Sequence, residues 1–169
     1  QAIEKKGILM KSSQACCEGK RCLDCNTVCE NCADSCPNRA NVVIKMADGR
    51  HEILHIDKMC NECGNCATFC PSAGAPYRDK PRIHLSRESF DNAPDGYRLA
   101  SPSRLEGKRG GKAFSLAAEK DGFVFESDAL IAHLDGGTLC ATKVTLNGGV
   151  NEAALSGAVE AATLFRLLA

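Results

Sequence analysis

Large aromatic side chains are scarce in this sequence. Its 169 residues include two tyrosines, six phenylalanines and no tryptophan. A small domain that cannot build its core from bulky apolar side chains usually needs disulfides or a metal to stay folded. Because the N-terminal half holds few such side chains, we expect something other than apolar burial to stabilise it.

An excess of charge of one sign is also missing. Lys and Arg together number 21, as do Asp and Glu, so the formal net charge is zero. Nucleic acids and anionic membrane surfaces attract strongly basic proteins, and this sequence shows no such excess. We therefore expect no nucleic-acid partner and no membrane partner.

Long apolar runs and a secretory signal are absent as well. No stretch approaches the roughly 18 consecutive apolar residues of a membrane-spanning helix. The first residues, QAIEKKGILMKSSQ, lack the basic, apolar and small-residue regions of a signal peptide. These absences predict a cytoplasmic protein, in which thiols stay reduced and a disulfide framework is not expected.

Motifs for catalysis and for dinucleotide binding do not occur. The sequence holds no G-x-G-x-x-G fingerprint, which FAD-binding and NAD-binding folds use to approach the pyrophosphate. The four histidines lie in strand-like segments without a serine or carboxylate motif beside them, and we expect structural or surface roles for them: His51, His55, His84 and His133. We predict no catalytic residue on this chain.

Cysteine, by contrast, is abundant. There are 12 cysteines, of which all but Cys140 lie between Cys16 and Cys70. Residues 60–71 read CNECGNCATFCP, and thiols at this density must be bonded to one another, bound to metal or chemically reactive. A zinc site uses two separate C-x2-C pairs, whereas three cysteines at x2 spacing followed by x3 and proline are typical of an iron-sulfur cluster.

The second cysteine run follows the bacterial ferredoxin pattern throughout. In that pattern Cys60, Cys63 and Cys66 would hold three corners of one cubane cluster, and Cys70, before Pro71, would reach the other cluster. Gly64 and Asn65 suit the loop around a cluster because both tolerate positive φ.

The first run, CLDCNTVCENCADSCPN over residues 22–38, departs from the pattern at one position. Its tail of Cys29, Cys32 and Cys36 matches, but Asn26 stands where the first ligand should fall. We favour Cys25 as that ligand, because one extra residue needs only a small bulge in the loop, and Cys22 is the alternative.

The ferredoxin pattern crosses the two runs, because the fourth cysteine of each run binds the cluster of the other. One cluster would take Cys25, Cys29, Cys32 and Cys70. The other would take Cys60, Cys63, Cys66 and Cys36. Each cluster would then connect both runs, so we expect protein without metal to lose structure.

A family resemblance follows from these residues. Residues 22–77 resemble the two-[4Fe-4S] ferredoxin family, and RCLDCNTVCENCADSCPNRANV, CNECGNCATFCP and PYRDK are similar to the C-terminal iron-sulfur region of selenate reductase flavoprotein subunits. Those proteins are similar to the small subunit of glutamate synthase and combine iron-sulfur clusters with FAD and a nicotinamide nucleotide. The resemblance implies electron transfer by two [4Fe-4S] clusters, as the relay module of a larger flavin-dependent oxidoreductase.

The resemblance also implies partners. FAD and NAD(P)H would be bound only by a partner or by a missing domain, so a flavoprotein domain or subunit and a second redox protein are the expected partners. Two alternatives remain: a catalytic fragment of an NAD(P)H/FAD-linked reductase, and a structural metal-binding interaction module.

The fold class that we predict is α+β, in three segments. Residues 1–21 form a lead-in, residues 22–79 a ferredoxin-like two-cluster domain, and residues 80–169 a small β-rich domain with a C-terminal helix. The ferredoxin-like domain repeats a cysteine run on each side of a hairpin, NVVIKMADGRHEILHIDK, with its turn at Asp48-Gly49. The β-rich domain reads as short alternating strands between DG, GG and NGG turns.

The predicted C-terminal helix starts at Asn151 as a cap. We expect its packed face to be Leu155, Val159, Ala162, Phe165 and Ala169.

Several other features are expected to have no role in the cluster sites. Cys16 and Cys17 are expected to be spare thiols, with a role in a further cluster or a labile thiol site together with Cys22 as the alternative. Cys140 is expected to be a small buried hydrophobe inside a strand. SRLEGKRGGK, residues 103–112, is expected to be a solvated glycine-rich loop, with docking of an acidic partner as the alternative.

Overall fold

The computed structural model describes residues 30–45, 51–71, 73–148 and 155–169. The chain divides into two compact units, residues 1–83 and residues 84–169. Several predicted features lie outside the described residues: the lead-in segment 1–21, the hairpin turn at Asp48-Gly49, the helix cap Asn151, and Cys16, Cys17, Cys22, Cys25 and Cys29.

The first unit combines short helical turns with a small sheet. Its helical elements are α3 (Asn31–Asp34), the 3-10 turn η2 (Asp57–Met59), α4 (Asn65–Thr68) and α5 (Pro76–Asp79). Its strands are β1 (Asn41–Lys45), β2 (His51–Ile56) and β3 (Arg82–Ile83).

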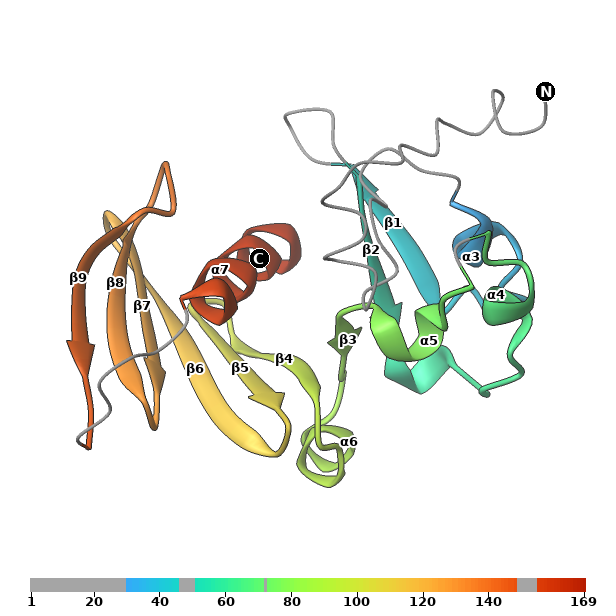
Figure 1. Ribbon diagram of the computed structural model, residues 1–169, viewed down its shortest axis with the longest axis horizontal. Helices are drawn as coiled ribbons and strands as arrows, with labels where there is room; N and C mark the ends of the chain where they lie inside the picture. The colour runs from blue at the N-terminus through green and yellow to red at the C-terminus, as the bar shows by residue number, and fades with distance from the viewer. Residues whose placement is uncertain (1–29, 46–50, 72, 149–154) are drawn as a thin grey trace. The chain divides into compact units, whose positions relative to one another are not determined.

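The predicted hairpin is confirmed as an antiparallel pair of strands. β1 and β2 run from the pair Asn41 and His55 to the pair Lys45 and His51, and β3 pairs parallel with β2. Their β-branched and other apolar side chains favour the extended backbone. Figure 1 shows α3 beside β1, so the helical turns that carry cysteines lie against the hairpin.

The second unit is an antiparallel meander with two helices. Its strands are β4 (Gly96–Ser101), β5 (Arg104–Arg109), β6 (Lys112–Glu119), β7 (Gly122–Ser127), β8 (Leu130–Asp135) and β9 (Ala141–Leu146). Each strand pairs antiparallel with the next in sequence. The helices are α6 (Arg87–Asn92), capped by the Ser86 hydroxyl, and α7 (Ser156–Leu168).

The core of the second unit lies between its sheet and α7, which crosses one sheet face (Figure 1). Leu105 and Leu116 on the sheet are fully buried, and the Phe123 ring meets the Phe165 ring of α7 edge-on at 5.7 Å. Burial of this apolar surface is the main driving force for the packing.

Polar contacts also fasten α7 to the sheet. The Tyr97 hydroxyl donates to one Glu160 oxygen at 2.7 Å, and the Arg109 guanidinium donates to the other at 2.8 Å. Burial raises the pKa of Tyr97, and the neighbouring Glu160 carboxylate raises it further. Tyr97 therefore stays protonated and acts as a donor.

A glycine allows aromatic rings to pack across the middle of this sheet. The Phe114 ring lies between the rings of Tyr97 and Phe125, at centroid distances of 5.8 and 5.3 Å. A Cβ atom at Gly107, which pairs with Phe114 on the next strand, would lie 2.2 Å from that ring. Only glycine leaves room for the ring at this position.

The interpretation of SRLEGKRGGK as a loop is wrong. Arg104–Arg109 forms β5 and Lys112 begins β6, which leaves a turn at Gly110 and Gly111 with positive φ. Leu105 is 0% exposed and anchors the strand in the core. Leu105 and Gly107 alternate with more exposed charged residues, which is the pattern of a half-buried strand.

The C-terminal helix is confirmed, and its predicted packed face is partly right, because Ala162 and Phe165 are buried as expected whereas Ala169 is exposed. Val159 is 39% exposed, whereas Ala158 is fully buried. The buried residues of α7 are Ala158, Ala161, Ala162, Leu164 and Phe165. Small alanines pack against the sheet because they let the helix approach it closely.

Cys140 also differs from its prediction. It is exposed and lies in the turn before β9 rather than buried inside a strand. Within the described ranges, no helix combines the length and the apolar character needed to span a membrane.

Candidate functional site

The two cysteine runs fold alike where the structure describes both. α3 and α4 each begin Asn-Cys-Ala and are each preceded by a residue with left-handed backbone, Glu30 at φ 48° and Gly64 at φ 79°. The cysteine in each turn is buried, Cys32 at 6% and Cys66 at 7% exposure. The internal repeat of the sequence is therefore a repeat of backbone conformation.

The same correspondence holds for the cysteine that precedes each proline. The Ala40 amide donates to the Cys36 sulfur at 3.2 Å, and the Gly74 amide donates to the Cys70 sulfur at 3.3 Å. In both runs the residue before the donor, Arg39 or Ala73, has positive φ. This conformation turns the amide of the donor residue toward the sulfur. Amides that point at cysteine sulfurs stabilise negative charge on them.

Thiols from both runs meet in one small core. Cys32 and Cys66 pack together with Ile53 of β2. Val43, Cys70 and Tyr77 pack around this cluster of buried residues. The Asn31 side-chain amide reaches the Phe69 carbonyl at 3.4 Å, which links α3 directly to the end of α4.

The surroundings of Cys60 show how near the two runs come. Burial raises the pKa of the Cys60 thiol, the Glu62 amide that donates to its sulfur at 3.3 Å lowers it, and charge on Cys66 and Cys36 raises it. Cys36 of the first run therefore lies within electrostatic reach of Cys60. Cys63, in the same set of predicted ligands, is exposed.

The predicted ligands thus divide into three groups. The structure brings Cys32 together with Cys66 and Cys70 in one core, and it places Cys36, Cys60 and Cys63 outside that core. Cys25, Cys29 and the alternative Cys22 lie outside the described residues.

The described cysteines form neither disulfides nor a site for a single metal ion. The seven cysteines that the structure describes are thiols rather than disulfides. Among those same described residues, no three cysteine, histidine or carboxylate side chains converge closely enough to hold one metal ion.

Two polar residues that are buried beside this core are not among the predicted ligands. Asn41 and His55 are buried, at 4% and 1% exposure, and stand opposite each other in the pairing of β1 with β2. The only signal in the sequence was their polarity at the ends of otherwise apolar strand segments. Of the other histidines, His84 is buried with its Nδ1 2.8 Å from the Ser89 hydroxyl.

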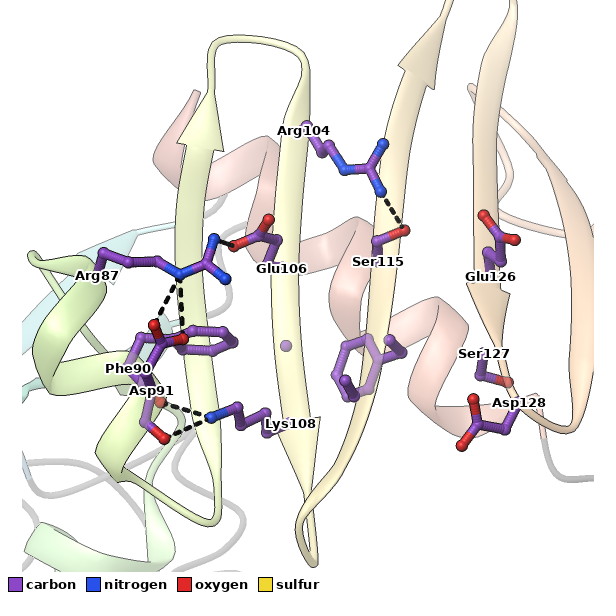
Figure 2. A pocket seen from close by; sticks show the side chains of 13 residues that line it. Arg87, Phe90, Asp91, Arg104, Glu106, Lys108, Ser115, Glu126, Ser127 and Asp128 are labelled. Carbon is purple, nitrogen blue, oxygen red and sulfur yellow. Dashed lines mark hydrogen bonds and ion pairs between the residues drawn. The ribbon is translucent and has the colours of Figure 1, made fainter.

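The second unit holds a pocket of about 460 Å³ beside α6, on the sheet face opposite to α7 (Figure 2). Its charged lining residues are Arg87, Asp91, Arg104, Glu106, Lys108, Glu126 and Asp128. Arg87 donates to both carboxylate oxygens of Asp91, at 3.0 and 2.9 Å. Lys108 donates to the carbonyls of Phe90 and Asp91, each at 2.9 Å. Arg87 thus stabilises α6 internally, and Lys108 connects α6 to β5. Docking of an acidic partner at residues 103–112 stays a prediction.

Known proteins resemble part of this chain. Over 107 residues, or 62% of its length, the chain is 42% identical to two proteins named "Putative oxidoreductase YgfK", from Escherichia coli O157:H7 and from Escherichia coli strain K12. The chain spans 10% of the length of these curated relatives. No protein-family model and no solved structure matches it. Similarity to proteins named as oxidoreductases supports a redox role in general terms.

Proposed function

We propose that this chain transfers electrons through two [4Fe-4S] clusters, as the relay module of a larger flavin-dependent oxidoreductase. The observation that carries the proposal is the structural repeat of α3 and α4. Both turns bury a cysteine in one shared core, and in both runs an amide donates to the sulfur of the cysteine before proline. The similarity to proteins named as oxidoreductases is consistent with this role.

The donor set fits iron and sulfide. A cubane cluster takes four thiolates, each on a different iron, so its ligands surround a compact volume instead of converging on one ion. Cys32, Cys66 and Cys70 from the two runs lie in or beside one core, which is consistent with ligands spread around a compact cluster. The electrostatic influence of Cys36 on Cys60 is consistent with the crossed assignment.

The crossed assignment divides the ligands into two sets. One cluster would be held by Cys60, Cys63, Cys66 and Cys36. The other would be held by Cys25, Cys29, Cys32 and Cys70, with Cys22 as the alternative to Cys25. When bound, each cluster would accept and return one electron, so two clusters could pass on the two electrons that a reduced flavin releases.

The protein would contribute position and electrostatics. Amides from Ala40, Glu62 and Gly74 that donate to cysteine sulfurs favour negative charge there and so raise the reduction potential of a bound cluster. The flavin and its nicotinamide donor would belong to a partner, a flavoprotein domain or subunit. A second redox protein would receive the electrons.

The test is the iron and acid-labile sulfide content of anaerobically purified protein, with EPR spectra before and after dithionite. We expect about eight irons and eight sulfides per chain, with two interacting spins after reduction. The variant Cys66→Ser should lose iron, whereas Cys140→Ser, at an exposed cysteine of the second unit, should keep the full content. Zinc in place of iron, or no metal in folded protein, would overturn the proposal and favour the interaction module.

A further inference from the structure

Two polar side chains are buried beside the cysteine core of the first unit. Asn41 on β1 and His55 on β2 face each other across the strand pair, at 4% and 1% exposure. Burying an amide or an imidazole without hydrogen bonds destabilises the fold. A pair kept at such a position needs strong internal contacts.

Those contacts form a chain that ends at a predicted cluster ligand. The Asn41 side-chain nitrogen donates to the Cys32 carbonyl at 2.9 Å. The Asn41 side-chain oxygen lies 2.8 Å from Nδ1 of His55. Because that oxygen can only accept, His55 must carry its proton on Nδ1 and donate. The two donors are aligned, and aligned hydrogen bonds polarise each other.

The backbone next to Asn41 secures the other cysteine of the same turn. The Ala40 amide donates to the Cys36 sulfur at 3.2 Å, and the Ala40 carbonyl accepts from the Ile56 amide at 2.7 Å. The start of β1 therefore contacts α3 through its side chain at Cys32 and contacts the Cys36 sulfur through its backbone.

Among the residues that the structure describes, the second repeat shows no equivalent of this chain of hydrogen bonds. Cys66 corresponds to Cys32 in the repeat, and Ala75 follows Cys66 at the same spacing at which Asn41 follows Cys32. Alanine has no side-chain amide that could donate a hydrogen bond. The backbone amide of Ala75 donates instead to the Asp79 carboxylate at 2.5 Å. The two turns thus differ in their electrostatic surroundings at this position.

We propose that Asn41 and His55 are positioning residues that make the reduction potential of the cluster held by Cys32 more positive than it would otherwise be. The inference rests on the proposed function. The donor chain places the positive end of its dipoles at the Cys32 peptide, and this favours an added electron nearby. The other cluster has no such contact at its matching turn.

The experiment is a redox titration of anaerobically purified protein, followed by EPR. The variant Asn41→Leu should move the midpoint potential of one cluster to a more negative value and leave the other unchanged. His55→Leu should move the same cluster in the same direction by less. His55→Asn keeps a donor near the position of Nδ1 and should restore the potential toward that of the wild type.

A double variant tests whether His55 acts through Asn41. If it does, Asn41→Leu combined with His55→Leu should show the potential of Asn41→Leu alone, since residues in one network are not additive. The matched control is His84→Leu, which also removes a buried, hydrogen-bonded histidine, at 2% exposure, but from the second unit. We expect both potentials to be unchanged in this control.

The outcomes separate this inference from the proposed function. Wild-type protein without iron and sulfide would overturn both. Three results would overturn only the inference. They are unchanged potentials in variants with full iron content, an equal shift of the potentials of both clusters, and a shift in His84→Leu as large as that in Asn41→Leu. If Asn41→Leu does not assemble clusters, the comparison of His55→Leu with His55→Asn decides the question.

Discussion

At the scale of single residues, Asp135 shows how one carboxylate can define a turn. It ends β8, and its Oδ1 accepts from the Thr138 amide at 2.7 Å, the Thr138 hydroxyl at 2.8 Å and the Gly137 amide at 3.0 Å. The Thr138 amide is the main cause that lowers the pKa of Asp135, with the Thr138 hydroxyl and the Gly137 amide next. The charged form is therefore the one that the fold prefers.

We predict that the variant Asp135→Asn removes a pH-dependent part of the stability. A carboxylate whose pKa is lower in the folded state stabilises the fold above its unfolded pKa, about 3.9, and loses this effect as pH falls through the folded pKa. In urea unfolding, wild-type protein should have the higher midpoint at pH 7, and the difference should shrink below about pH 4. A difference that stays constant with pH would contradict this account.

At the scale of elements, α7 is positioned by its alanines. Ala158 is 0% exposed and Val159 is 39% exposed, although the two are neighbours. We predict that Ala158→Glu lowers the free energy of unfolding of the second unit by about 3–5 kcal/mol, because it buries an unpaired charge. Val159→Glu introduces the same charge one position along and should change stability by about 0.5 kcal/mol. Urea denaturation followed by circular dichroism measures both, and equal losses would contradict the observed face.

How well the sequence predicts an element depends on how local its signal is. The helix of α7 has a clear period of 3.6, but alanines such as Ala158 and Ala161 are weak markers of a buried face beside Val159. The strand β5 was mistaken for a loop because Gly107 and charged neighbours suggest solvent, while the Phe114 ring that requires this glycine comes from the next strand. Such pairings across strands carry no local signature.

How well the sequence predicts the candidate site also depends on how local each signal is. The spacing of Cys60, Cys63 and Cys66 can be read directly, since these residues lie in one short run. The electrostatic influence of Cys36 on Cys60 joins two runs that are far apart in the sequence, so only a known crossed pattern could predict it. The contact of Asn41 with His55 depends on the register of β1 with β2, which the sequence alone does not specify.

At the scale of the whole molecule, the two units differ in what stabilises them. The second unit buries large apolar side chains between a sheet and a helix, among them Leu105, Leu116 and Leu164. The first unit buries smaller and fewer apolar side chains in its described part, among them Leu54 and Ile83, and one of its clusters consists of two thiols around Ile53. Small domains that bury few large apolar side chains usually depend on a metal or on disulfides.

We therefore predict that removal of the proposed iron-sulfur clusters unfolds the first unit and spares the second. Bound metal stabilises the fold that forms its site, so its loss should expose the amides of β1 and β2 to exchange. Hydrogen exchange measured by mass spectrometry should show lost protection in the peptide segments of β1 and β2, and retained protection in β6, β7 and β8. Reconstitution with iron and sulfide under reducing conditions should restore the protection. If β1 and β2 stay protected in metal-free protein, the hairpin and its core are stable without the clusters, and the crossed ligation is not needed for folding.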